Sequence, residues 1–160
     1  MGGTWEVGWD GSFQPNLGAA GVGITFSRPG GAPLVSFSMP VYASDATRTE
    51  ALGPALASLP LVAWFSPSWI CFRGDSAYVV GLLDRSRCPS NIWYFNCLEL
   101  TRDLLTGWVY RAVWIPRELN AICDLLARQA VTSGNIEITL SQEGPPLLRA
   151  ILAKALPHWQ

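Results

Sequence analysis

Apolar and polar residues alternate along three consecutive stretches at the start of the chain, residues 4–10, 19–27 and 33–42. A period of two residues is typical of β-strands with one buried face. The stretches are separated by short segments rich in proline and glycine, residues 15–18 and 29–31. Because connections this short join antiparallel neighbours, the pattern predicts a three-stranded antiparallel meander.

A helical pattern follows this meander. Asp45 or Thr47 is expected to be the N-cap of a helix that continues to about Leu59. Thr47 and Glu50 have the spacing of a capping box, which gives Glu50 a purely structural explanation. Pro54 lacks the backbone N–H that would bond to the carbonyl of Glu50, so it is expected to kink or shorten the helix.

Two more strands and three more helices are predicted in the next stretch of the chain. The apolar residues Phe95, Leu98 and Leu105 are expected to form the core face of the second of these helices, rather than a platform for stacking bases. A strand followed by a helix after a run of hairpins indicates a mixed sheet with helices on its faces, an α/β fold. The predicted strands are Trp69–Asp75 and Trp108–Ile115, and the helices are Ser76–Leu83, Ile92–Thr106 and a helix from the cap Asn120 to about Thr132, with Ile122, Leu125 and Leu126 in its core stripe.

The last part of the chain, residues 134–160, is predicted to be an appendage to a domain formed by residues 1–133. Ile136, Ile138 and Leu140 alternate as in a strand. A break at residues 144–146 precedes a short amphipathic helix over Leu147–Leu156. We expect its apolar stripe to pack on the domain itself rather than on a partner.

Composition narrows the function classes. Hydrophobic residues make up 49% of the chain and charged residues only 14%, which excludes a disordered protein. The longest apolar run is too short to span a bilayer, and no basic segment precedes an apolar stretch as in a signal peptide, so we expect an intracellular monomer without membrane contact, in the cytoplasm or nucleus. The net charge of -1 does not indicate nucleic-acid binding, although the cations are arginines except for Lys154.

Four acidic residues stand at the junctions of the predicted elements: Asp10, Glu50, Asp75 and Asp124. Asp10 precedes Gly11, so on its own it is explained as a turn residue. If the first and fourth strands are neighbours, however, Asp10 and Asp75 lie side by side, and two helix starts bring the other two acids to the same place. Four converging carboxylates repel one another, and hard divalent cations such as Mg²⁺ relieve that repulsion.

These acids lie within short motifs, and the sequence over roughly residues 4–132 resembles the type 1 ribonuclease H family. No single motif is specific, but their order and spacing together are. The motifs are Asp10-Gly11-Ser12, residues 18–23, Thr47 to Ala51, Asp75 to Val80, Pro116 to Asn120 and Cys123 to Ala127. The resemblance implies an RNase H-like fold, with a mixed five-stranded sheet of three antiparallel strands and then two parallel strands, flanked by helices.

The resemblance also implies an activity. Family members are endoribonucleases that hydrolyse the RNA strand of RNA–DNA hybrids by two-metal-ion catalysis, with Mg²⁺ or Mn²⁺. Asp10, Glu50, Asp75 and Asp124 would be the metal ligands, with Asp10 shared between the two ions, and Arg117 would assist catalysis. The residues that would contact the substrate are Gly11, Ser12, Thr47, Arg48, Ser76 and Asn120.

The sequence departs from the family pattern in three places. The family often has a histidine in the loop before the last helix, whereas the only histidine here is His158. Arg117 occupies that loop, either as a phosphate contact or as a solvated charge. The amides that precede the helix glutamate in the family are replaced by Ala46 and Thr47, and the lysine-rich segment between the middle helices is absent, so weak affinity for nucleic acid is expected.

Two alternative functions remain open at this stage. One is a non-catalytic scaffold or connection domain with the same fold, as in a reverse-transcriptase polyprotein, although such domains usually lose their acids. The other is a different metal nuclease of the same fold, which Asp10-Gly11-Ser12 and Asp75-Ser76 argue against. A reverse transcriptase or another retroelement domain is a candidate partner.

Overall fold

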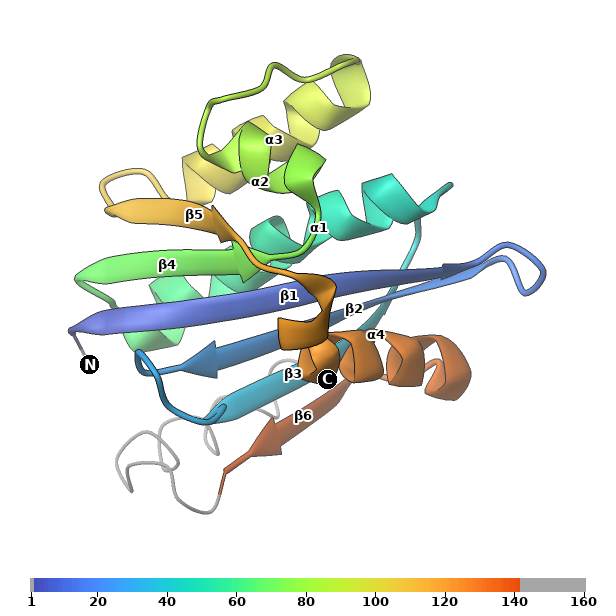
Figure 1. Ribbon diagram of the computed structural model, residues 1–160, viewed down its shortest axis with the longest axis horizontal. Coiled ribbons are helices and arrows are strands. Elements are labelled where there is room, and N and C mark those ends of the chain that lie inside the picture. Colours follow the sequence, from blue (N-terminus) through green and yellow to red (C-terminus); the bar gives the residue numbers. More distant parts are fainter. Residues whose placement is uncertain (1, 142–160) are drawn as a thin grey trace.

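A computed structural model describes residues 2–141 of the chain (Figure 1). Within this part, six strands form a single sheet in the order β5-β4-β1-β2-β3-β6. Strands β1, β2 and β3 pair antiparallel, while β4 and β5 run parallel to β1, as the sequence predicts for a mixed sheet. The strands are β1 (Thr4–Gln14), β2 (Ala19–Ser27), β3 (Val35–Val41), β4 (Trp69–Gly74), β5 (Tyr110–Trp114) and β6 (Glu137–Leu140).

The sixth strand corrects the expectation of a five-stranded sheet. Strand β6 lies in the stretch expected to be an appendage, and it pairs antiparallel with β3, with Phe37 opposite Ile138. Alternation of apolar residues predicts the strand itself, but it does not show which sheet edge the strand joins. The amphipathic helix expected over residues 147–156 lies outside the described residues.

The helices form layers on both faces of the sheet (Figure 1). Helix α1 packs on β1 and β2 and is covered in turn by α3, whereas α4 crosses β1, β2 and β3 on the opposite face. None of the described helices has the length and apolar character needed to cross a membrane. The helices are α1 (Ala46–Pro60), a π-helical turn η1 (Leu61–Phe65), α2 (Ala77–Leu83), α3 (Ile92–Leu104), a 3₁₀ turn η2 (Arg117–Leu119) and α4 (Ala121–Ser133).

Helix α1 continues through Pro54, so the prediction that this proline shortens it is wrong. Pro54 is buried, and the neighbouring Gly53 lies directly against the indole of Trp9. The hydroxyl of Ser58 donates a hydrogen bond to the Pro54 carbonyl at 2.7 Å, whereas the acceptor that loses its helical donor is the Glu50 carbonyl. Packing of α1 on the sheet therefore outweighs the lost backbone hydrogen bond.

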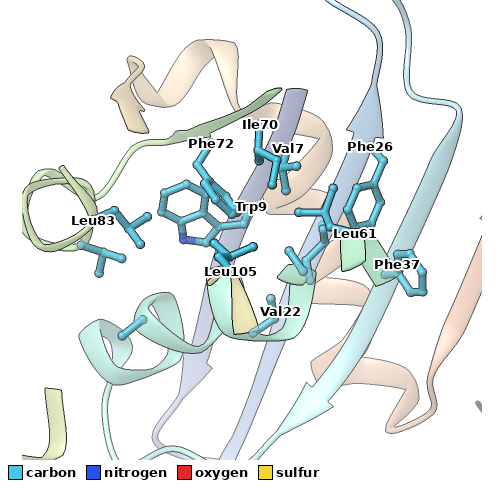
Figure 2. Packing of buried hydrophobic residues seen from close by; sticks show 14 of the residues in the cluster. Val7, Trp9, Val22, Phe26, Phe37, Leu61, Ile70, Phe72, Leu83 and Leu105 are labelled. Atoms are coloured by element: carbon cyan, nitrogen blue, oxygen red, sulfur yellow. The ribbon is translucent and has the colours of Figure 1, made fainter. Parts of the chain in front are cut away.

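The core lies between the sheet and α1. Trp9 stands at its centre, surrounded by Phe72, Leu83 and Leu105, as Figure 2 shows. On the same face of β1, Trp5 packs edge-on against Phe65 of the π-helical turn, with ring centroids 4.6 Å apart. The face of β1 that carries Trp5 and Trp9 is thus fully buried, and the alternate residues, Asp10 among them, point toward α4.

Helix α4 approaches the sheet closely because two glycines of β2 face it. A side chain at Gly21 or Gly23 would collide with the backbone of α4. The face of α4 that meets these glycines is built from small residues, Cys123, Ala127 and Ala130, which are all buried. Helix and sheet therefore meet backbone to backbone.

This contact corrects the predicted core stripe of α4. Ile122 and Leu125 are 53% and 52% exposed, and Leu126 is half-buried. The large apolar residues do not fit over a glycine-lined sheet, so they turn outward. In α3 the same kind of correction applies to Phe95, which is 48% exposed, while the predicted core residues Leu98 and Leu105 are buried.

Candidate active site

The acids Asp10, Glu50 and Asp75 come together in one cluster. One carboxylate oxygen from each lies within 4.8 Å of the others. Asp10 belongs to β1, Glu50 to the start of α1, and Asp75 directly follows β4. Strands β1 and β4 are parallel with Gly8 opposite Arg73, a register that places Asp10 level with Asp75.

Asp10 lies within a strand and not in a turn. Strand β1 continues to Gln14, and its pairing with β2 runs through Gly11 opposite Val22. The interpretation of Asp10-Gly11 as a turn is therefore wrong. Asp10 is only 5% exposed, and its Oδ1 accepts a hydrogen bond from the Gly11 N–H.

Gly11 holds the first two acids together. Its backbone N–H donates to Oδ1 of Asp10 at 2.9 Å and to Oε1 of Glu50 at 3.1 Å. Any side chain at this position would meet the backbone of Thr49 and Glu50. The absence of a side chain is thus what lets the start of α1 approach β1 closely enough to bring Glu50 to Asp10.

Glu50 has no part in a capping box. The N-cap of α1 is Asp45, whose Oδ1 accepts a hydrogen bond from the Arg48 N–H at 2.7 Å. Glu50 instead points toward Asp10, and its Oε2 atom is buried without a hydrogen-bond partner among the described residues. An unpartnered buried carboxylate oxygen is costly, and this one lies inside an acidic cluster.

Burial and mutual repulsion shift Asp10 and Glu50 toward their neutral forms. The pKa of Glu50 is raised to about 10 by burial, which is the largest cause, together with the hydrogen bond and the charge of the Asp10 carboxyl. Burial also raises the pKa of Asp10, and the charges of Asp75 and Asp124 add to that effect. In the absence of a cation, the Asp10–Glu50 pair therefore keeps a proton at neutral pH.

Asp75 is positioned by Asn120. The buried Asn120 amide donates from Nδ2 to Oδ2 of Asp75 at 3.3 Å and to the backbone carbonyl of Trp9 at 2.9 Å. Asn120 does occupy the N-cap position of α4, but its side chain makes no capping hydrogen bond, so that part of the prediction is wrong. The side chain spans β1 and β4 at the edge of the acidic cluster instead.

Asp124 lies close to the cluster but is not part of it. Its Oδ2 accepts from Nη2 of Arg128 at 2.8 Å, one helical turn further along α4. It remains near enough for its charge to raise the pKa of Asp10. The structure thus brings three of the four predicted acids together, and the fourth stands beside them in an ion pair.

The other predicted site residues are placed as follows. Ser12 is buried in β1, whereas Thr47 and Arg117 are exposed at the surface. Ser76 is the N-cap of α2, and its Oγ accepts from the Val79 N–H at 3.3 Å. Its hydroxyl therefore has a structural role next to Asp75.

Arg48 already has two partners. Its guanidinium lies 3.7 Å from the Asp45 carboxylate and 5.0 Å from the centre of the Trp93 ring. These contacts hold the side chain against α3, on the same side of the sheet as Glu50.

Two residues next to the acids were missed by the sequence analysis. Arg128 follows Asp124 by four residues, a spacing at which opposite charges pair on a helix, so this signal was present in the sequence. Trp114 donates from Nε1 to the Asp75 carbonyl at 3.1 Å. Strand alternation places Trp114 on a face, but no pattern indicates its contact with Asp75.

The chemistry of the cluster fits a hard divalent cation. It offers carboxylate oxygens only, and one of them is a buried atom without a partner. Oxygen ligands of this kind suit Mg²⁺ or Mn²⁺. A groove of about 470 Å³ lies beside Asn120, but none of the three acids lines it, so the acidic cluster and not the groove is the candidate site.

Comparison with known proteins shows the fold of the chain but assigns it to no sequence family. No protein-family model and no curated protein sequence matches the chain. Solved structures do match. RNase H1 from the halophilic archaeon Halobacterium salinarum superposes with a TM-score of 0.74 at 23% identity, over 81% of this chain and 98% of that one.

Two further structures give a similar result. LC11-RNase H1 in complex with an RNA/DNA hybrid, a protein isolated from compost, has a TM-score of 0.74 at 19% identity, covering 81% of this chain and 98% of that one. A foamy viral protease-reverse transcriptase in complex with double-stranded DNA has a TM-score of 0.58 at 16% identity, covering 81% and 94%. With a mixed sheet, helices on both faces and an acidic cluster formed by β1, the start of α1 and the residue after β4, this chain has the RNase H fold.

Proposed function

We propose that the protein is an endoribonuclease that hydrolyses the RNA strand of RNA–DNA hybrids with the help of divalent cations. The observation that carries this proposal is the convergence of Asp10, Glu50 and Asp75 within 4.8 Å in an RNase H fold. A structural neighbour, LC11-RNase H1, binds an RNA/DNA hybrid. A scaffold domain would have no need for three acids that destabilise one another.

Asp10, Glu50 and Asp75 would hold the cations. Asp124 would join from α4 when it exchanges Arg128 for a cation. When bound, two such ions supply an activated water and stabilise the charge on the leaving oxygen. Their positive charge would also remove the proton that the Asp10–Glu50 pair keeps in their absence.

The chain's own residues would orient the acids and the substrate. Asn120 fixes the carboxylate of Asp75 from one side. Backbone groups at Gly11 and Ser12 would lie against the 2′-hydroxyls of the RNA strand, the groups that distinguish RNA from DNA. Arg117, exposed on the turn before α4, would contact a phosphate.

The test is a cleavage assay on three labelled substrates: an RNA–DNA hybrid, double-stranded RNA and double-stranded DNA. Each is incubated with the protein in Mg²⁺, Mn²⁺ or EDTA. The expected result is cation-dependent cleavage of the RNA of the hybrid alone, with no cleavage by an Asp10→Asn variant. Cleavage of DNA would identify a different metal nuclease, and no cleavage under any condition would favour a scaffold.

Association with a reverse transcriptase is a second candidate role, favoured by the similarity to the foamy viral protein. Co-purification of the protein with a polymerase domain, together with unchanged cleavage by the isolated chain, would show that the two roles coexist.

A further inference from the structure

Trp114 occupies an unusual position beside the acidic cluster. It ends β5, the edge strand of the sheet, and pairs with Gly74, the residue before Asp75. Its indole N–H donates to the Asp75 carbonyl at 3.1 Å. The residue is nevertheless 52% exposed. An indole is thus held in one orientation with much of its ring surface in water.

The other side chains on the same face of β5 are half-buried. Tyr110 packs edge-on against Phe72 with ring centroids 6.0 Å apart, and Ala112 contacts the core. Tyr110 and Ala112 therefore contact the core, whereas Trp114, the last residue of β5, is exposed. Trp114 lies next to the end of β4, where Asp75 follows. Exposed aromatic surface that is held rigidly next to a reactive site is typical of a contact surface for a ligand.

We propose that Trp114 is a substrate-positioning residue, whose exposed ring packs against the sugar of the RNA nucleotide next to the scissile phosphate. This inference rests on the proposed function. In a hybrid duplex the bases are stacked inside, so the sugars and phosphates are what a surface residue meets. If the scissile phosphate lies at Asp10, Glu50 and Asp75, an exposed indole that is bonded to the backbone of Asp75 is in a position to meet the adjoining ribose.

The hydrogen bond to Asp75 gives the contact a second consequence. Since the indole N–H is anchored to the residue that carries the carboxylate, the position of the ring is tied to that of the acid. Packing of the sugar on Trp114 would then fix the distance between the scissile phosphate and the carboxylates of the cluster. The contact is uncharged, so it differs from an arginine–phosphate contact in its dependence on salt.

The experiment compares Trp114→Ala and Trp114→Phe with a matched control, Trp69→Phe. Trp69 is 53% exposed and lies at the start of β4, six residues before Asp75, or about 20 Å away along the strand. For Trp114→Ala we expect KM for the hybrid to rise about 5- to 10-fold while kcat changes less than about 2-fold. Trp114→Phe keeps a ring but loses the anchor, so a rise of about 2- to 3-fold is expected.

Two further measurements separate substrate packing from a structural role at the sheet edge. The slope of log KM against log salt should be the same in Trp114→Ala as in the wild type, because no phosphate contact is lost. In EDTA, where cleavage is suppressed, hybrid should quench the tryptophan fluorescence of Trp69→Phe, which retains Trp114, more than that of Trp114→Phe.

The outcomes distinguish this inference from the proposed function. If the wild type cleaves hybrid but the Trp114 variants have its KM, or lose affinity only together with thermal stability, the positioning role is wrong and the proposed function stands. If the wild type does not cleave hybrid, the proposed function fails. The quenching measurement then decides on Trp114 alone: equal quenching in both variants, or none in either, overturns the inference.

Discussion

Replacement of Glu50 by glutamine should stabilise the cation-free protein at neutral and alkaline pH. Glutamine keeps an oxygen that accepts the Gly11 N–H, which Glu50 accepts at 3.1 Å, but it carries no charge. The pKa of Glu50 rises from 4.5 to about 10, so at pH 7 the carboxyl stays neutral about 2.5 pH units (7 − 4.5) above its ordinary pKa. At about 1.4 kcal/mol per unit, this amounts to at most about 3.4 kcal/mol.

Sharing of one proton with Asp10 and access of water reduce the gain to on the order of 2 kcal/mol. The sign follows from linkage. A carboxyl whose pKa is raised by folding contributes stability fully below its unfolded pKa, and this contribution is lost as the pH rises toward its folded pKa. The wild type should therefore lose stability between about pH 5 and pH 9, a loss that glutamine at position 50 avoids.

The assay is thermal and urea unfolding of both proteins in EDTA at pH 5, 7 and 9. At pH 7 the variant should melt about 4–8 °C above the wild type, since about 1 kcal/mol shifts the Tm of a chain of this size by about 2–4 °C. Addition of Mg²⁺ should raise the Tm of the wild type more than that of the variant, because Glu50 is a proposed ligand. Glu118→Gln, at an exposed residue of η2, is the matched control.

A difference in stability between variant and wild type that is the same at pH 5 and pH 9 would refute this reasoning. So would a variant that melts below the wild type at pH 9. Either result would mean that ionisation of the Glu50 carboxyl does not destabilise the folded protein. The proposed cation site would then lose its electrostatic basis, although the convergence of the three acids would remain.

Three further changes test the rest of the site. Asp75→Asn should lower cleavage of hybrid by at least about 10³-fold without lowering the Tm, because it removes a ligand and a repelling charge together; a large drop in Tm would contradict this. Asn120→Ala should cost about 1–3 kcal/mol in urea unfolding, because the buried Trp9 carbonyl loses its partner, and should also slow cleavage. Arg117→Ala should slow turnover by about 10-fold without abolishing it; an unchanged rate in a steady-state assay would make Arg117 a solvated loop charge.

The sequence could predict that Asp10, Glu50 and Asp75 come together. The strands and the helix that carry these acids are each indicated by a local sequence pattern, and the order of the elements along the chain restricts the possible topologies. Alternation predicts β1 and β4, and a parallel pair with acids at equivalent positions brings Asp10 and Asp75 to one level. The helix that carries Glu50 begins directly after the meander. Only the choice of neighbouring strands had to be assumed.

The faces of α4 could not be predicted from its own sequence. Periodicity favours Ile122 and Leu125 as the buried residues, because they are the largest apolar side chains of the helix. The actual contact is decided by Gly21 and Gly23 of another element, which admit only small residues such as Ala127. Burial on a helix is thus decided by the shape of the surface that it meets as well as by its own hydrophobicity.

The cation-free site compensates its negative charge in three separate ways. A proton is retained by the Asp10–Glu50 pair, the Asn120 amide meets Asp75, and Arg128 neutralises Asp124. A cation that binds at this cluster has to displace the proton. Because ligand carboxyls bind a metal in their ionised form, cation binding and proton release are linked at this site.

Arg128 gives Asp124 a different role from the other acids. Asp124 lies on α4, and the close packing of α4 against the glycines of β2 fixes the position of its backbone. A rotation of the Asp124 side chain is therefore what would move its carboxylate from Arg128 to the cluster. An exposed ion pair of this kind is weak, on the order of 0.5 kcal/mol, and a divalent cation shared with Asp10 would outweigh it. The ion pair with Arg128 accounts for the separation of Asp124 from the other three acids, and a cation bound at the cluster would compete with Arg128 for the Asp124 carboxylate.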